Sequence, residues 1–269
     1  MPRTSGTLLT RQASYSTDKG LQLYGPTCWK DLTQDQLRWL LRLMCHCFER
    51  AAVKTYMFCT FCGVDVKERT SEGFKCVVRT PKRKVVYLRP WQVQSLIHQF
   101  DFIDHVEDCD VRLEHVKGYH AVDINMRKVT FEDYLLAERY YQLYLIHRQD
   151  RFLNQLARYL YHGDDDKAIH EDVKFEPEEL LGVFFWYQHI KKVLAENFPN
   201  FFRQGDYESE DYDLIAEMNT QIRALTGGDV LKEAAIRQID CWRALTELDA
   251  KAREIEIQRK QLEKIKNQN

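Results

Sequence analysis

The chain has 269 residues, of which 44% are hydrophobic and 12% aromatic, a composition that excludes disorder over most of its length. Its 39 basic and 41 acidic residues leave a net charge of -2, which excludes a global positive field that would attract nucleic acid. The sequence shows neither a run of about 18 uncharged apolar residues, as a membrane span requires, nor the apolar core of a secretory signal. We therefore expect a cytoplasmic protein whose eight cysteines are free thiols.

The first third of the chain predicts a flexible arm, two helices and a hairpin. Residues 1–27 are rich in Ser, Thr and Gly without a sustained period, which predicts the arm. Thr33 and Gln36 have the spacing of a capping box ahead of an apolar helical period, which predicts an amphipathic helix. Two β-branched and aromatic runs within 74–88 flank a basic loop that contains proline, which predicts a β-hairpin. Pro90 begins the second helix.

The middle of the chain predicts further helices after a stretch with little pattern. We expect loop or short strands over residues 103–129. A helix starts at Thr130, and its pattern is consistent with one long helix or with two helices joined near Asp150. Pro177 opens another helix, which ends at the Pro199 turn.

The C-terminal segment predicts one long amphipathic helix. No Pro or Gly occurs after Asp229, and apolar residues recur at alternating spacings of four and three. This apolar seam consists of Cys241, Leu245, Leu248, Ala252, Ile255 and Leu262. Arg259 interrupts the seam after barely three heptads, so a coiled coil and a helix packed on its own core both remain open. We expect the first half to pack and the charged half from Glu256 onward to project.

These elements predict a mainly α protein. It has a flexible N-terminal arm over residues 1–27 and a helical core over 28–204 with one small β-hairpin near 74–88. Residues 205–269 form a C-terminal helical segment that contains the long amphipathic helix. No internal repeat is visible.

A CxxC pair is the motif closest to a known chemistry. Cys59 and Cys62 have the spacing at which two thiolates hold one tetrahedral zinc ion. Cys76 follows, but no second CxxC or HxxxH pair completes a structural site, and Cys76 alternates with Phe74 and Val78 on one hairpin face as a packed residue would. We therefore expect no metal and no cofactor, with Cys59, Cys62 and Cys76 as the alternative zinc set.

Two charged clusters and a set of missing motifs bear on catalysis and nucleic-acid binding. Histidines crowd the middle segment without the spacing of known ligands, which favours a solvated loop; they are His98, His105, His115 and His120. Basic residues gather at the hairpin, where an exposed charged turn competes with a phosphate contact; they are Lys75, Arg79, Lys82, Arg83, Lys84 and Arg89. The chain has no P-loop, GxGxxG or GxSxG motif. We expect no enzymatic activity and no catalytic residues.

Three segments carry a resemblance: PTCWKDLTQDQLRWLLRL near the start, FFWYQHIKKVLAENFPNFF in the middle, and ALTGGDVLKEAAIRQIDCWRALTELDAKARE near the end. Together they resemble a structural-module protein family of tailed phages and prophages of gut anaerobic bacteria. The resemblance covers residues 26–255 and implies a tail-assembly or other virion-associated role. It implies no catalytic residues.

The sequence and this resemblance together lead to one functional expectation. We expect a non-enzymatic phage assembly or virion-associated protein, such as a tail-assembly chaperone, in the cytoplasm of the bacterial host or in the virion. It would bind a protein partner, such as another phage structural protein, and no membrane or nucleic acid. Oligomerisation through the C-terminal helix remains open. The expected partner-binding residues are Leu245, Leu248, Ile255 and Leu262. The alternative is a small zinc-binding or nucleic-acid-binding accessory protein.

Overall fold

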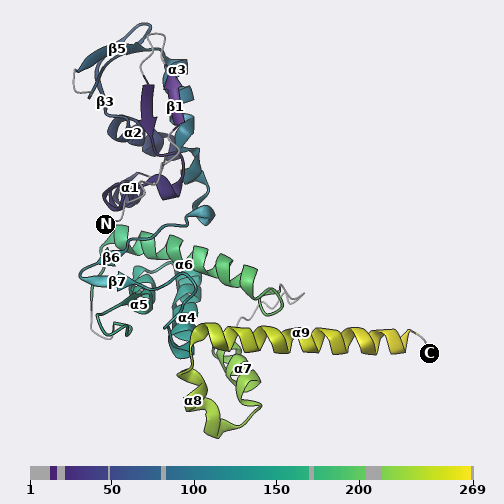
Figure 1. Cartoon of the computed structure of the whole chain (residues 1–269). Coiled ribbons are helices and arrows are strands. Elements are labelled where there is room, and N and C mark those ends of the chain that lie inside the picture. Colours follow the sequence, from purple (N-terminus) through teal and green to yellow (C-terminus); the bar gives the residue numbers. More distant parts are fainter. Residues whose placement is uncertain are drawn as a thin grey trace, which may run out of the picture. The chain divides into compact units, whose positions relative to one another are not determined.

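The computed structural model (Figure 1) describes residues 13–16, 22–47, 49–79, 83–169, 173–203 and 214–267. The chain divides into two compact units, of which unit 1 ends at Val111 and unit 2 begins at Arg112. This boundary lies inside the segment 28–204, which the sequence analysis assigned to one helical core. No cluster of Gly, Pro or Ser marks it, so composition gave no signal for it. The expected boundary at residues 204 and 205 lies outside the described residues.

Unit 1 mixes short helices with two antiparallel sheets in its described part. Its helical segments are η1 (Trp29–Asp31), α1 (Gln34–His46), α2 (Arg50–Phe61), α3 (Pro90–Ile97), η2 (His98–Asp104) and η3 (Val106–Asp108). One sheet pairs β1 (Ala13–Ser16) with β2 (Gln22–Gly25), and the other has the order β3 (Val64–Thr70), β4 (Gly73–Val78), β5 (Lys84–Leu88). Helix α2 packs against β3, α3 and η2, and its Val53 and Met57 have no exposed surface. The core of unit 1 therefore surrounds α2.

Two predictions in unit 1 are confirmed by local contacts. Helix α1 begins with the expected capping box, in which the Thr33 hydroxyl accepts from Gln36 N at 3.2 Å and Gln36 Oε1 accepts from Thr33 N at 2.9 Å. The predicted hairpin is the β4–β5 pair, with Phe74 opposite Leu88.

Helix α2 has no clear apolar period, and for that reason the sequence pattern does not predict it.

The expected flexible arm is corrected where the structure describes it. Strands β1 and β2 pair with each other, and Leu23 of β2 is only 2% exposed. Gly25 lies so close to Cys62 that an added Cβ would approach its Sγ to 3.2 Å. A four-residue strand is too short to show a period, which is why the sequence suggested an arm. Residues 1–12 and 17–21 lie outside the described part.

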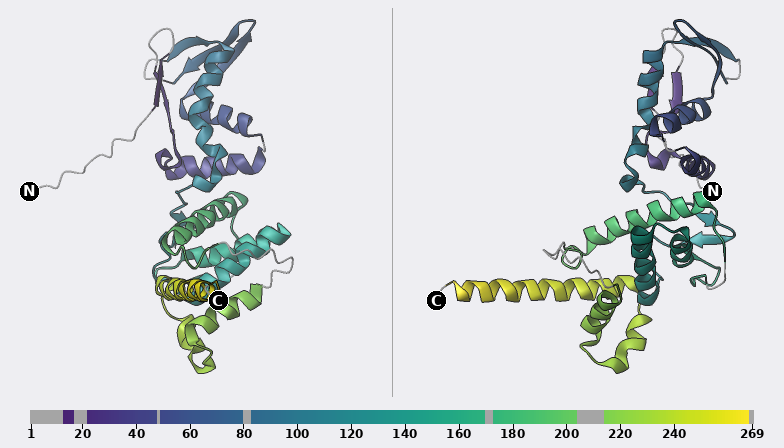
Figure 2. Two further views of the ribbon diagram at one scale, coloured as in Figure 1. Left: turned by 90° about the vertical axis from the view of Figure 1, so that its right-hand side faces the viewer. Right: turned by 180° about the vertical axis from the view of Figure 1, so that it is seen from behind.

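Unit 2 is a helical assembly with one small sheet in its described part. Its helices are α4 (Phe131–His147), α5 (Asp150–Leu160), α6 (Pro177–Asn197), α7 (Leu214–Thr226), η4 (Val230–Lys232), α8 (Glu233–Arg237) and α9 (Cys241–Lys266). The sheet has the order β6 (His115–Val116), β7 (Tyr119–Ala121), β8 (Tyr161–His162). Helix α5 packs against both α4 and α6, and α9 packs against α4 and α7. Figure 2 shows these helices from two further sides.

Most helix ends of unit 2 lie where the local sequence signals place them. The Thr130 hydroxyl accepts a hydrogen bond from Asp133 N at 3.1 Å and caps α4. Arg148 adopts a left-handed backbone with φ of 53° and separates α4 from α5. The sequence pattern left open one long helix or two, and the structure has two. Pro177 is the first residue of α6, as expected.

The final helix is shorter than the sequence pattern predicts. It begins at Cys241 rather than near Asp229, because η4 and α8 precede it as separate short turns. Asp240 leaves the helical conformation, and its Oδ1 accepts from Arg243 N at 3.1 Å as the cap of α9. A cap of this kind has no effect on the apolar period. For that reason the sequence pattern did not separate α9 from the short turns that precede it.

The expected fold class is confirmed in its main features and corrected in one. The described residues are 62% helical, and the long C-terminal helix is present. The expectation of one small hairpin is wrong, because the described part contains three small antiparallel sheets. Several of their strands have only two to four residues and leave no alternation in the sequence. Among the described helices, none is long and apolar enough to cross a membrane.

Candidate functional site

Helix α9 is tied at its start to the beginning of α4. Cys241 N donates to Val129 O at 2.9 Å, and Phe131 N donates to Ile239 O at 2.8 Å. Lys128 N donates to Asp240 Oδ2 at 3.1 Å. These contacts fix the direction in which α9 leaves unit 2.

The first two turns of α9 lie in the core of unit 2. Its buried residues are Cys241, Ala244, Leu245 and Leu248, where the helix packs against α4 and α7. Trp242 stands edge-on to Phe198 with the ring centroids 4.8 Å apart. Leu245 has no exposed surface and Leu248 is 4% exposed. These two of the four residues expected to bind a partner therefore pack within the chain itself.

Asp249 marks the end of the packed half of α9. Its carboxylate accepts from Asn200 N at 2.8 Å, from Asn200 Nδ2 at 2.9 Å and from Phe201 N at 3.0 Å. Partial burial acts to raise the pKa of Asp249, but these donors outweigh it and hold the pKa below its ordinary value. Two turns further, Arg203 Nη1 lies 3.3 Å from Glu256 Oε1. The turn after α6 thus holds α9 as far as Glu256.

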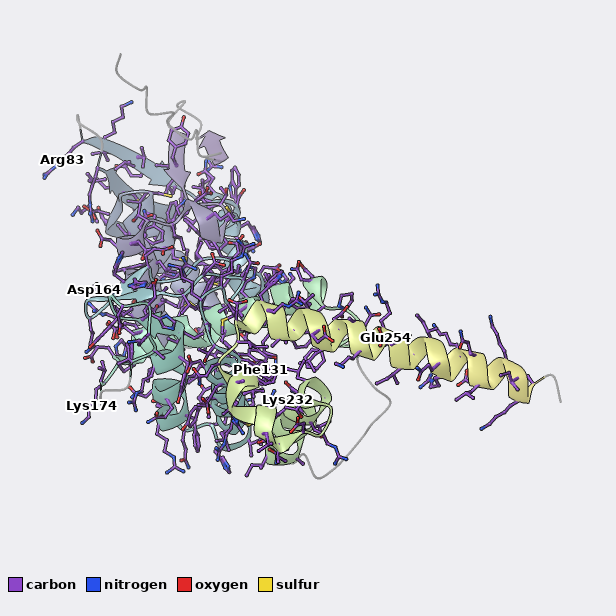
Figure 3. All side chains as sticks on the ribbon, turned by 60° about the horizontal axis from the view of Figure 1, so that its bottom comes forward. Arg83, Phe131, Asp164, Lys174, Lys232 and Glu254 are labelled. Carbon is purple, nitrogen blue, oxygen red and sulfur yellow. The ribbon has the colours of Figure 1, made fainter. Side chains whose placement is uncertain are left out.

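Beyond Glu256 every described residue of α9 is exposed. At about 1.5 Å per residue, the ten residues from Ile257 to Lys266 extend about 15 Å. Figures 1 and 2 show this part of α9 well beyond the other helices of unit 2, and Figure 3 shows the side chains toward the end of α9 with no neighbouring element around them. We call residues 251–267, which follow the last buried turn of α9 and include the partly exposed residues up to Glu256, the projecting end.

The projecting end exposes large apolar side chains. Ile255 is 66% exposed, Leu262 60%, Ile265 56% and Ile257 49%. Ile255 and Leu262 are seven residues apart. They continue the apolar seam to which Leu248 belongs inside the core. Ile255 and Leu262 were expected from the sequence, whereas Ile265 was not. Ile265 lies three residues after Leu262 on the same face, and that spacing could have identified it.

Most of the remaining residues of the projecting end are charged. Residues 251–267 contain six lysines and arginines against three glutamates, in a chain whose net charge is -2. Arg259 Nε lies 3.7 Å from Glu256 and 3.6 Å from Glu263, and Lys260 lies 3.3 Å from Glu256. Such pairs stabilise an exposed helix, and basic residues near its C-terminus are favoured by the helix dipole.

The CxxC cysteines lie at the end of α2. Burial raises the pKa of Cys62 to about 12 and that of Cys76 to about 11, and it also raises the pKa of Cys59. Zinc binds thiolates, which these environments disfavour at neutral pH. Gln99 Nε2 lies 3.8 Å from Cys62 Sγ, and among the described residues no three His, Cys, Asp or Glu side chains come together as metal ligands.

The histidines of the middle segment are divided between the two units. His98 and His105 belong to unit 1, where they face Asp101 at 2.9 Å and Glu107 at 3.3 Å. His115 and His120 belong to unit 2. His120 Nε2 lies 3.4 Å from Asp166 Oδ1, and Lys128 Nζ lies 2.7 Å from the other oxygen of the same carboxylate. Each described pair is a local surface contact.

The basic cluster at the hairpin is partly neutralised. Arg79 Nη2 lies 2.6 Å from Asp65, and Lys75 lies 3.9 Å from Glu68. Arg83 and Lys84 are exposed, whereas Lys82 lies outside the described residues. A hollow of about 580 Å³ is lined by Thr70–Phe74, Val85–Arg89 and Gln92. It contains no Cys or His, so it offers neither a thiol nucleophile nor an imidazole base.

No protein-family model, no curated protein and no solved structure matches this chain.

Proposed function

We propose that this chain is a non-enzymatic assembly protein that acts through protein–protein contacts made by the projecting end of α9. The observation that carries the proposal is the exposure of Ile255, Leu262 and Ile265 on a helix that leaves the body of unit 2. Leaving one such side chain in water forgoes roughly 1.5 to 3 kcal/mol relative to burying it. A projecting amphipathic helix is a common means of docking into a partner.

The two halves of α9 have separate tasks in this proposal. Leu245 and Leu248 anchor the helix in unit 2, and Ile255 and Leu262 contact the partner. Asp249 and Glu256 hold the base of the helix in one direction through the turn after α6. The partner thus meets a helix whose orientation is already fixed, which lowers the ordering cost of association.

The biological setting that we propose is virion assembly in a tailed phage, with tail-assembly chaperone as the specific role. This part rests on the resemblance of the three segments between residues 26 and 255 to a family of tailed phages and prophages. Other phage structural proteins are the proposed partners, met in the cytoplasm of the bacterial host or in the virion. A chaperone of this kind needs no catalytic residues, only a surface that covers a partner until it assembles.

Deletion of the gene from a lysogen tests this function. We expect normal host growth after deletion and, upon induction, particles without tails in electron micrographs. The full chain should restore tails, as should the exposed-site control Lys260→Ala, whereas a chain lacking residues 257–269 should fold but fail to restore them. Normal particles after deletion would refute the phage role, and restoration by the truncated chain would refute the role of the projecting end.

A further inference from the structure

Strand β5 is an edge strand that runs along the hollow of unit 1. It stands at one end of the order β3, β4, β5, so among the described strands only β4 pairs with it (Figure 1). The hollow is lined by every residue from Val85 to Arg89. Alternate residues of an antiparallel strand direct both backbone groups away from their partner strand. No described backbone group outside the β4–β5 ladder bonds to Lys84–Leu88, so this edge offers donors and acceptors to an added strand.

The opposite edge of the same sheet is less suited to an added strand. The register of β3 against β4 shifts between Val66 and Glu68, and such a bulge breaks the regular spacing of backbone groups along an edge. Strand β5 pairs with β4 without a shift over all five of its residues. The regular edge, which is also the one that borders the hollow, is therefore the better site for strand addition.

The side chains of β5 offer apolar contacts on both faces of the sheet. On one face Val85 is 56% exposed and Tyr87 is 66% exposed. On the other face Val86 and Phe74 are partly exposed where they line the hollow, next to the buried Leu88. Side chains of an added strand alternate between the two faces. One set would therefore enter the hollow, and the other would lie beside Val85 and Tyr87.

Basic residues outnumber acidic residues in this part of unit 1. Residues 64–89 contain eight lysines and arginines against three aspartates and glutamates, in a chain whose net charge is -2. Two of the three acidic side chains already lie next to a basic one; the pairs are Asp65 with Arg79 at 2.6 Å and Glu68 with Lys75 at 3.9 Å. The segment therefore keeps a positive excess that its own carboxylates do not neutralise.

This excess includes the two ends of β5. Arg83 and Lys84 at its start and Arg89 after its end are exposed, and none of the three forms an ion pair with a described carboxylate. Glu72 also lines the hollow, and this single carboxylate can offset at most one of the three charges. A bound strand with carboxylates at both ends would be attracted by the charge that remains.

Two copies of β5 oppose like charges in either orientation. Antiparallel pairing brings Lys84 of one copy toward Arg89 of the other, and parallel pairing brings each residue toward its own counterpart. The sequence from Arg83 to Arg89 contains no acidic residue that could compensate. Like charges opposite one another destabilise strand pairing, and basic residues are a common means of keeping edge strands apart. The charge of β5 thus favours an acidic strand over a second copy.

We propose that β5 binds an extended segment of a partner protein, which carries acidic residues on both sides of a short apolar run and adds a strand to this sheet. Its backbone pairs with β5, its side chains enter the hollow and cover Val85 and Tyr87, and its carboxylates face Lys84 and Arg89. In this mode of recognition main-chain bonds give affinity and side-chain contacts give specificity. The surface belongs to unit 1 and does not involve the projecting end, so the inference goes beyond the proposed function and is independent of it.

Two synthetic peptides test the charge preference with the full chain. The first is a fluorescein-labelled peptide of about ten residues, enough to span β5 and its flanks, in which Val and Thr alternate between two Glu residues at each end. Its twin has Lys in place of each Glu. Fluorescence anisotropy should show at least about tenfold tighter binding of the acidic peptide. Equal binding of the twins would overturn the proposed acidic partner.

Backbone methylation separates strand pairing from charge attraction alone. One version of the acidic peptide carries N-methyl groups on alternate residues of its centre and keeps one complete edge of donors. Another carries N-methyl groups on every central residue and keeps neither edge. We expect the first to bind within about threefold of the parent peptide and the second at least about tenfold more weakly. A fully methylated peptide that binds as tightly as its parent would exclude strand addition.

Matched aromatic variants locate the contact on the protein. Tyr87→Ala should weaken binding of the acidic peptide at least about fivefold. Tyr56→Ala removes a ring of similar exposure on α2, outside the hollow, and should leave binding unchanged. Both side chains are more than half exposed, so neither change should lower the melting temperature. The same loss of binding in both variants would place the peptide elsewhere.

Matched charge variants test the ends of β5. Lys84→Glu combined with Arg89→Glu should abolish the preference for the acidic peptide over its lysine twin. Lys67→Glu combined with Arg69→Glu changes the net charge equally on β3, with β4 between the two strands, and should preserve that preference. Equal effects of the two double variants would show attraction by net charge rather than recognition at β5.

Two further measurements decide against other occupants of this edge. Light scattering at about 100 µM should give the same mass for the full chain and for Tyr87→Lys, because β5 does not join two copies. A dimer that Tyr87→Lys dissociates would identify a second copy as the occupant and overturn the proposal. A fluorescein-labelled oligothymidylate should bind more weakly than the acidic peptide. Tighter binding that Lys84→Glu combined with Arg89→Glu abolishes would assign the surface to single-stranded nucleic acid instead.

Discussion

The two halves of α9 share one apolar seam and have opposite environments. Leu245 and Leu248 are buried against α4 and α7, whereas Ile255 and Leu262, on the same seam, are more than half exposed. The local helix is equally regular in both halves. A heptad pattern therefore predicts a helix with an apolar face and does not determine whether the chain itself covers that face.

The largest expected effect comes from a charge placed in the packed half. Leu245→Asp should destabilise unit 2 by more than about 4 kcal/mol, because it leaves an unpaired carboxylate in the core and a cavity around it. Leu262→Asp, the same change in the projecting end, should alter stability by less than about 0.5 kcal/mol. Thermal denaturation followed by circular dichroism compares the two. Similar melting temperatures for both variants would show that the halves do not differ as described.

Removal of side-chain atoms gives a smaller and more graded contrast. Leu248→Ala should cost about 2 to 4 kcal/mol, because the 4% exposed side chain leaves a cavity when it is shortened. Ile255→Ala, one heptad later, should cost no more than about 0.5 kcal/mol. Urea denaturation measures both free energies of unfolding. A loss above about 2 kcal/mol for Ile255→Ala would mean that the chain covers Ile255.

Asp249, at the junction of the two halves, should show a pH-dependent effect. Asp249→Asn removes the charge that three donors share and should cost about 1 to 2 kcal/mol at pH 7. Because the folded pKa of Asp249 lies below the unfolded value of about 3.9, its stabilisation is present above that value and is lost as the pH falls through the folded pKa. The two unfolding free energies, measured from pH 7 down to pH 2.5, should therefore converge below about pH 4. A constant difference over this range would argue against an ionised Asp249.

The smallest expected effect is that of removing the projecting residues themselves. Removing residues 257–269 should change the free energy of unfolding by less than about 0.5 kcal/mol, because every described residue of the full chain from Ile257 onward is exposed. Differential scanning calorimetry against the full chain provides the measurement. A clear drop in melting temperature would place these residues in the folding unit rather than in a docking surface.

Capping and turn chemistry made much of the fold predictable. Thr33, Thr130 and Pro177 begin helices as expected, because the groups that satisfy a helix end lie within four residues along the chain. The alternating runs of the β4–β5 hairpin were visible because its two strands are close together in the sequence. Strand β2 was missed, because burial of Leu23 depends on elements distant in sequence rather than on any local pattern.

The candidate site shows the same division between local and distant information. By itself the sequence determined that the C-terminal segment is a long amphipathic helix, that Ile255 and Leu262 share its seam, and that its last turns are charged. Tertiary packing places Leu245 and Leu248 inside unit 2, and it places the third turn of α9, at Asp249, against the turn after α6. The physical reason is that helix formation depends on neighbours three and four residues away, whereas burial depends on which distant elements pack against each turn.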